Sequence, residues 1–296
     1  MVVFYQIMGA KQSVLSLYKK RGETPLECLE RFKIENPEYK NEKMTYAGRL
    51  DPLAEGLLLL LVGEECKNKE KYLGLDKEYE VDVLFGFATD TYDILGLVTE
   101  TFDKDFVISV KTGIHDGLIN LDSRLRGNDT INELLNSFIG RFTQKYPAYS
   151  SKTINGETMF SLSKSGKLND EEIPKKDVEI KNIELLDQKT ISKNDLEKYI
   201  INSINFVKGD FRQKEILENW ESVLGSVIPA KAGIQNLDPR LRGDDKNTCR
   251  FNIISIRVNC TSGTYMRTLA NSIGEKIGIP ALALNIKRTK IGKYTI

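Results

Sequence analysis

The stretch "YAGRLDPLAEGLLLLLVGEE", residues 46–65, holds one aspartate, Asp51, directly before a proline and an apolar run. Residues 57–62 are continuously apolar, which predicts a fully buried strand. Gly48 permits a tight turn, and Pro52 fixes its own φ and favours an extended residue before it. We therefore expect a rigid loop at a sheet edge, from which the carboxylate of Asp51 faces a cleft. By spacing alone, however, an aspartate before proline is more typical of a turn-forming residue than of a catalyst.

The length and hydropathy of the chain limit the class of protein to which it can belong. Its 296 residues are enough to bury a substantial core. The longest apolar run, residues 57–62, is far shorter than the roughly 18 residues that a membrane-spanning helix needs. The N-terminal sequence "MVVFYQIMGAKQ" lacks the basic region that precedes the apolar part of a signal peptide. We therefore expect a cytoplasmic protein with no membrane association.

The residues that usually bind metals or form disulfides are few and scattered. Cys28, Cys66, Cys249 and Cys260 form no C-x-x-C pair, so neither a zinc site nor a disulfide framework is indicated. Reduced, buried thiols are the expected state. The single histidine, His115, weakens any mechanism that needs several imidazole ligands or a histidine base. We expect no metal and no cofactor.

Two segments of the chain repeat each other. They are "ISVKTGIHDGLINLDSRLRGNDT", from Ile108, and "IPAKAGIQNLDPRLRGDDK", from Ile228, and they match at 12 of 19 aligned positions. Two copies are too few for a solenoid, which needs at least three. We expect surface insertions at residues 107–129 and 226–246, because long surface loops have a small entropic cost. His115 lies inside the first copy, which argues against a catalytic role.

The segments around these insertions alternate between helix and strand patterns. Thr24 and Thr130 each begin a sequence typical of a capping box, which predicts helices through about residue 33 and across residues 130–139. Further helices are expected over residues 266–277, ending at Gly278, and twice within residues 193–224. Residues 78–87 and 252–260 alternate as half-buried strands do. This mixture predicts an α+β fold.

Charge is balanced overall but uneven along the chain. The net charge is +1, yet residues 141–168 carry five basic side chains against one acidic, and residues 264–296 carry six against one. These segments predict a phosphate-binding surface if they fold together, or else a solvated basic face. Arg267 falls in the first turn of the helix expected at 266–277. If it meets Asp51, the ion pair keeps that carboxylate deprotonated, as an attacking oxygen requires.

Four motifs carry a resemblance to a known family. They are "AGRLDPLAEGLLLLLVGEECK", "DKEYEVDVLFGFATDTYD", "YPAYSSKTINGETMFSLSKSG" and "CTSGTYMRTLANSIGEKIG", followed by "IKRTKIGKYTI". Their order resembles that of the TruB family of tRNA pseudouridine synthases over residues 19–296, apart from the two repeats and extra residues near 190–225. The resemblance implies a pseudouridine synthase fold, with a central, mostly antiparallel mixed sheet flanked by helices and loops, in a single catalytic domain spanning residues 1–296.

The resemblance also implies roles for particular residues. Asp51 matches the catalytic aspartate, and Tyr79 matches the tyrosine that stacks on the target base. Tyr265 matches an aromatic residue that packs in the site, and Arg267 matches the arginine that pairs with the aspartate. Ile286 stands where the family usually has a leucine that lines the pocket, and Asp93 matches an acid near that arginine. A metal bound by Asp90 and Asp93 is the weaker alternative, because two acids do not complete a coordination shell.

The implied reaction is isomerisation of uridine 55 in the TΨC arm of tRNA. The bond from ribose C1′ to uracil N1 breaks, the base turns, and C5 joins C1′. The aspartate attacks the base or the sugar, or stabilises the cleaved state, and the sequence leaves these routes open. The uridine must be flipped out of its stack and held against an aromatic face such as Tyr79.

Two departures from the family pattern bear on RNA recognition. Tyr46 stands where the family usually has a histidine that stacks within the bent RNA loop. The chain ends at Ile296, where many members continue into a C-terminal RNA-binding (PUA) domain. We therefore expect a protein without that domain, which binds tRNA through the basic residues 141–168 and the basic C-terminus. We also expect a monomer.

Three alternatives stay open. The first is a synthase of the same fold that acts on another RNA, as dyskerin-type enzymes do. The second is a non-catalytic RNA-binding or tRNA-folding protein, which would not need an Asp–Arg pair. The third, a hydrolase with an aspartate nucleophile, lacks a second acid at a plausible spacing.

Overall fold

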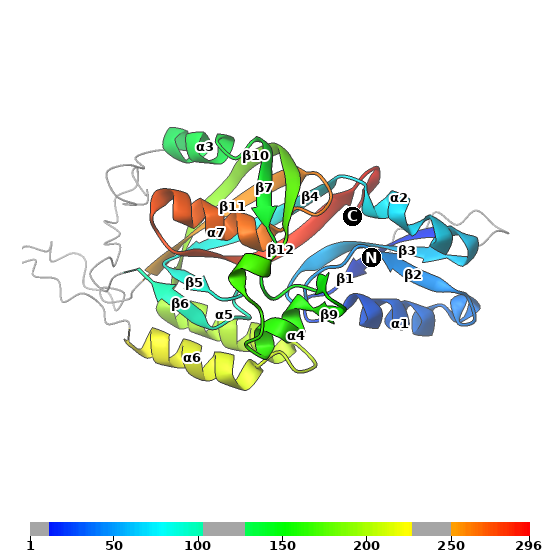
Figure 1. Cartoon of the computed structure of the whole chain (residues 1–296), viewed down its shortest axis with the longest axis horizontal. Helices are drawn as coiled ribbons and strands as arrows, with labels where there is room; N and C mark the ends of the chain where they lie inside the picture. Colours follow the sequence, from blue (N-terminus) through cyan, green and yellow to red (C-terminus); the bar gives the residue numbers. More distant parts are fainter. Residues whose placement is uncertain (1–11, 103–127, 227–249) are drawn as a thin grey trace, which may run out of the picture.

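A nine-stranded sheet runs through the chain (Figure 1). The computed structural model describes residues 12–102, 128–226 and 250–296. The main path of the sheet is β1 (Val14–Lys19), β3 (Glu55–Val62), β12 (Ala281–Ile291), β4 (Lys77–Phe85), β11 (Arg250–Cys260), β10 (Lys175–Ser192) and β7 (Gly140–Lys145), with β2 (Met44–Ala47) on β3 and β13 (Tyr294–Thr295) on β12. Only β3 and β12 pair in parallel among these strands. The expected mixed, mostly antiparallel sheet is confirmed.

The remaining elements within the described residues are seven α-helices, two small hairpins and three short 3-10 helices (Pro37–Tyr39, Gly63–Asn68 and Asp170–Glu172). The helices are α1 (Pro25–Glu35), α2 (Lys69–Leu73), α3 (Asn128–Asn136), α4 (Met159–Lys164), α5 (Lys193–Phe206), α6 (Gln213–Ser226) and α7 (Met266–Ile277). The hairpins are β5 (Phe87–Thr89) with β6 (Val98–Thr101), and β8 (Thr153–Ile154) with β9 (Glu157–Thr158).

The strand β3 is buried on both faces, as its apolar run predicts. Leu58 and Leu60 pack in a cluster with residues of α1, while Leu57, Leu59 and Leu61 pack on the other face with α2 and β12. Helix α1 begins at a complete capping box, in which the side chains and backbone amides of Thr24 and Glu27 bond each other. The segment that follows Asp51 is therefore anchored in the core.

Two helical layers cover opposite faces of the centre of the sheet. Val81 and Val83 of β4 point towards α7, whereas Leu84, the residue after Val83, points towards the cluster that contains α5 and α6. In that second cluster Trp220 of α6 is buried and donates its indole N–H to Ile94 O at 3.2 Å. Helix α7 ends at Gly278 in the left-handed region, as expected. The sheet thus presents one face to each helical layer.

Three expectations about element boundaries are wrong. Strand β4 stops at Phe85, because Gly86 has φ 104° and turns the chain into a separate hairpin. Helix α3 starts at Asn128, so Thr130 lies inside it, and it ends at Asn136, which leaves residues 137–139 outside. The capping-box pattern at Thr130 is thus not the helix start, and helical bonding extends two residues further towards the N-terminus.

The expected insertions lie almost entirely outside the described residues. Residues 128 and 129 belong to α3 and residue 226 to α6, which shortens both insertions at those edges. His115 and Cys249 also fall outside the described part of the chain. Cys28 and Cys260 are buried free thiols, and burial raises the pKa of each to about 11, while Cys66 is half-buried. Across the described ranges no helix combines the length and apolarity that crossing a bilayer requires.

Candidate active site

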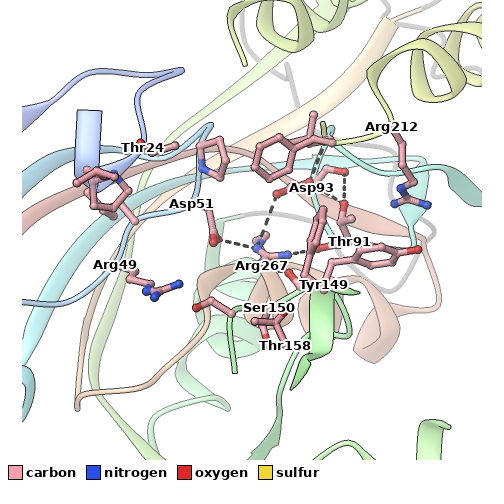
Figure 2. A pocket seen from close by; sticks show the side chains of 18 of the residues that line it. Thr24, Arg49, Asp51, Thr91, Asp93, Tyr149, Ser150, Thr158, Arg212 and Arg267 are labelled. Carbon is pink, nitrogen blue, oxygen red and sulfur yellow. Dashed lines mark hydrogen bonds and ion pairs between the residues drawn. The ribbon is translucent and has the colours of Figure 1, made fainter. Parts of the chain in front are cut away.

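Asp51 lies in the short loop that connects β2 to β3. Gly48 begins the loop with φ 87°, and the amide of Ala54 closes it by donating to the carbonyl of Asp51 at 3.0 Å. The side chain of Asp51 is 39% exposed. The loop is therefore a turn, as the position before proline suggested, and the carboxylate of Asp51 also borders a cavity (Figure 2).

A buried lysine holds the C-terminal half of this loop. Lys19, at the end of β1, is fully buried, and its Nζ donates to Ala54 O at 2.5 Å and Pro52 O at 3.3 Å. Burial lowers the pKa of Lys19 from 10.5 to about 8, although the charge of Asp51 opposes this effect. Lys19 thus donates to two carbonyl groups of this loop, one of which, Pro52 O, also accepts from the amide of Gly22 at 2.8 Å.

A buried arginine spans both ends of the same loop. Arg288 of β12 is 1% exposed, and it donates from Nε to Leu57 O at 2.8 Å and from Nη1 to Arg49 O at 3.1 Å. Its backbone lies beside Gly56 in the parallel β3–β12 pairing. A Cβ on Gly56 would lie 2.3 Å from Arg288 O, so only glycine permits this approach. Sequence reasoning missed both cations, because each stands in a basic stretch that resembles a surface.

The charge of Asp51 is matched by Arg267, as predicted. Arg267 lies in the first turn of α7, is 3% exposed, and donates from Nε to Asp51 Oδ2 at 2.8 Å. Its other nitrogens donate to Thr91 O at 2.7 Å and Tyr149 O at 3.2 Å. Burial alone would lower the pKa of Arg267, but the charges of Asp51 and Asp93 raise it. The guanidinium is therefore charged and fixed in orientation.

Asp93 and Asp90 serve different arginines. Asp93 Oδ2 lies 3.7 Å from Arg267 Nε, while its Oδ1 accepts hydrogen bonds from the Thr91 hydroxyl and the Leu95 amide. Burial raises the pKa of Asp93, and the charge of Arg267 opposes this rise. Asp90 instead pairs with Arg212 at 2.8 Å. The described residues contain no cluster of three or more potential metal ligands.

Two cavities flank Asp51, and the expected substrate-binding residues divide between them. The first, of about 280 Å³, is lined by Asp51 together with Tyr79, Tyr265, Ile286 and Arg288. Burial raises the pKa of Tyr79, and it raises that of Tyr265 to about 12 with a further contribution from the charge of Asp51. This cavity thus brings two aromatic rings and an apolar side chain to the carboxylate.

The second cavity, of about 290 Å³, shares Asp51 with the first and lies on the side of Arg267 and Asp93. Tyr46 lines this cavity and not the first, so it is separated from the other expected aromatic residues. Figure 2 shows Asp51 and Arg49 on one side of Arg267, and Tyr149 and Arg212 on the other.

Sequence reasoning did not single out Tyr149 or Arg212 as part of the site. Tyr149 belongs to the quoted motif "YPAYSSK", but its contact with Arg267 is made by a backbone carbonyl, which no residue type reveals. Arg212 follows the expected helix in a loop, where an arginine is ordinarily solvated. Only the packing of α5 and α6 brings it to Asp90.

Comparison with known proteins gives three findings. The family model described as TruB family pseudouridylate synthase (N terminal domain) matches residues 37–114 and 120–203, more than half of the chain. A protein of Ligilactobacillus salivarius named tRNA pseudouridine synthase B is 28% identical over 96% of this chain and 68% of its own length. The protein of the same name from Aquifex aeolicus is 26% identical over 95% of this chain and 69% of its own.

Solved structures give a more distant match. A crystal structure of a Cbf5-Nop10-Gar1 complex contains a chain 16% identical to this one, with a TM-score of 0.48. The alignment covers 95% of this chain and 49% of the other, so this chain spans about half the length of that one.

Proposed function

The chain belongs to the TruB family of pseudouridylate synthases, and we propose that it isomerises uridine 55 in the TΨC arm of tRNA with Asp51 as the nucleophile. The family identified from the motifs is thereby confirmed. The names of the relatives, tRNA pseudouridine synthase B, support tRNA as the substrate. The observation that carries the proposal is the pairing of Asp51 with buried Arg267 beside a cavity that two tyrosines line.

The reaction rearranges bonds without a net gain or loss of atoms. The N1–C1′ bond breaks, C5 bonds to C1′, C5 releases a proton, and N1 regains one, so no oxidant is consumed. Arg267 Nε donates a hydrogen bond to Oδ2 of Asp51, so the other carboxylate oxygen is the one that attacks the ribose or the base. A fixed charge pair needs little reorganisation when the nucleophile reacts. The role of Arg267 is thus to balance the charge of the reacting carboxylate and to hold it in place.

The flipped uracil occupies the first cavity. Stacking on an aromatic ring such as Tyr79 contributes roughly 1–3 kcal/mol per base, which offsets the loss of stacking in the RNA. Tyr265 keeps its hydroxyl proton near neutral pH, because its pKa is about 12. Its backbone is held from both sides by Gln144, with hydrogen bonds of 2.8 and 3.1 Å. Ile286 supplies the apolar surface against which the base packs.

An unmodified tRNA transcript tests this proposal. Wild-type protein is incubated with the transcript, and pseudouridine is mapped by chemical probing. We expect modification at position 55, no turnover by Asp51→Asn, and unchanged tRNA affinity of that variant. Asp177→Asn, which changes an exposed acid of β10, is the matched control and retains activity.

The possible outcomes separate the alternatives. Absence of pseudouridine at position 55 with wild type would refute the substrate assignment, and pseudouridine elsewhere would indicate another RNA site. Binding without any modification would indicate a non-catalytic protein. Activity retained by Asp51→Asn would show that another group is the nucleophile. The monomeric state and the cytoplasmic location stay predictions.

A further inference from the structure

The loop between α5 and α6 forms part of the wall of the second cavity. Phe211 and Arg212 lie in this loop and line the cavity together with Asp51. Gln213 holds the loop, because its side chain bonds the carbonyls of Val207 and Gly209 and accepts from the amide of Phe211. The match to the family model ends at residue 203, so the loop between α5 and α6 lies outside the matched range.

Aromatic rings from three segments meet in this wall. The ring centroids of Phe160 and Phe211 are 5.4 Å apart, and those of Tyr149 and Phe160 are 5.8 Å apart. The guanidinium of Arg212 lies 4.2 Å from the centre of the Tyr149 ring. Arg212 also has φ 61°, a conformation that is uncommon outside glycine and is kept only where the surroundings enforce it.

The charges around the second cavity suit a neutral ligand. Arg212 is paired with Asp90 at 2.8 Å, and Arg267 is paired with Asp51 at 2.8 Å. The two arginines therefore contribute little net attraction for an anion. Aromatic and guanidinium surfaces with balanced charge are typical of sites that stack an unpaired base.

Arg49 lies where the two cavities meet. It lines both of them, and it is exposed. The cavities are of similar size, about 280 and 290 Å³, and share the wall that carries Asp51. If uracil fills one cavity, an adjacent nucleotide reaches the other across this rim, and the linking phosphate passes the guanidinium of Arg49.

We propose that the second cavity binds an unstacked base next to the target uridine, that Phe211 is a stacking residue of this site, and that Arg49 contacts the phosphate between the two nucleotides. This inference rests on the proposed function, because it assumes that an RNA loop enters the cleft. It adds a second point of recognition that the α5–α6 hairpin supplies.

A double-mutant cycle in binding tests the stacking contact. Kd is measured for wild type and Phe211→Ala with a TΨC stem-loop, and with the same RNA made abasic at the nucleotide before or after the target. We expect Phe211→Ala to weaken binding of intact RNA by roughly 5- to 150-fold, as for the loss of one stacked base. For one of the two abasic RNAs the same substitution should change Kd less than twofold.

Control variants separate stacking from folding. Phe206→Ala, on the same hairpin and 64% exposed, should bind all RNAs as wild type does. Phe211→Tyr keeps a ring and should retain wild-type affinity. Arg49→Met should weaken binding of every RNA alike and lower the slope of log Kd against log salt by about one.

Equal losses on intact and both abasic RNAs, or no loss in Phe211→Ala, would overturn the proposal. Because the cycle measures binding, it is decided separately from turnover. A wild type that forms no pseudouridine at position 55 would refute the proposed function alone.

Discussion

Replacing Arg288 should release the loop that carries Asp51. Arg288→Met removes two hydrogen bonds from a charged donor, to Leu57 O and Arg49 O, while an apolar chain of similar length fills the space. Hydrogen bonds to charged groups contribute about 1.5–3 kcal/mol each, so the loss is about 3–6 kcal/mol.

One group offsets part of this loss. Nη2 of Arg288 is buried and has no hydrogen-bond partner among the described residues, at a cost of about 1–3 kcal/mol that the substitution removes. Taking the middle of each range, the net expected decrease in the free energy of unfolding is about 2.5 kcal/mol. Arg288→Lys keeps a charge but loses the planar fork, so it should recover only part of this stability.

Urea unfolding at pH 7 measures the decrease, and turnover at saturating tRNA measures the effect on Asp51. We expect kcat to fall by about 100-fold with little change in KM, because a shift of about 1 Å in a reacting group has this effect. Lys287→Met changes the neighbouring, half-exposed cation on the other face of β12 and is the matched control. A stability of Arg288→Met within 0.5 kcal/mol of wild type by urea unfolding would refute the reasoning.

Two further predictions concern the same loop. Gly56→Ala should lower the free energy of unfolding by more than about 3 kcal/mol, because φ is 109° and the new Cβ would meet Arg288 O at 2.3 Å, whereas Gly156→Ala, with φ 88° and open space, should lower it by about 1–2 kcal/mol. Between pH 8 and 10.5, Lys19 is deprotonated in the folded protein but protonated in the unfolded chain. The free energy of unfolding of wild type should therefore increase by about 3 kcal/mol as the pH rises through this range, and Lys19→Met should lack this increase. Denaturant unfolding measures both, and a pH-independent difference between wild type and Lys19→Met would contradict the second.

Local patterns predicted the elements that position Asp51 and Arg267. A continuous apolar run predicts a strand buried on two faces, and helical spacing with a terminal glycine predicts α7 to its last residue. Their meeting was a hypothesis, based on Arg267 falling in the first turn of this helix, and the structure confirms the contact. The error at Gly86 arose because strand alternation continues past the glycine at which the chain turns. The error at Thr130 arose because a capping-box pattern lies inside a helix that begins two residues earlier.

The buried cations could not be predicted in the same way. Lys19 and Arg288 stand in the stretches "YKKRG" and "IKRTK", where basic residues on both strands are typical of a solvated surface. Their burial depends on β1 and β12 lying on either side of β3, a pairing between segments more than 200 residues apart. Neither spacing nor composition predicts such a strand pairing. The ion pair between Arg212 and Asp90 also joins residues far apart in the sequence, and no local pattern predicts it.

The arrangement around Asp51 divides two requirements of a nucleophile between different groups. Its charge is matched by one side chain, Arg267, which touches the carboxylate and no backbone atom of the loop. Its position is set by Lys19 and Arg288, which bond the carbonyls of residues 49, 52, 54 and 57 and no atom of the carboxylate. Loss of Arg267 should therefore remove the charge partner of Asp51 and leave the loop in place, whereas loss of Arg288 should displace the loop and leave Arg267 in place. The loop that carries Asp51 is thus held rigid by two buried cations, Lys19 and Arg288, which leave the carboxylate of Asp51 itself available for the reaction.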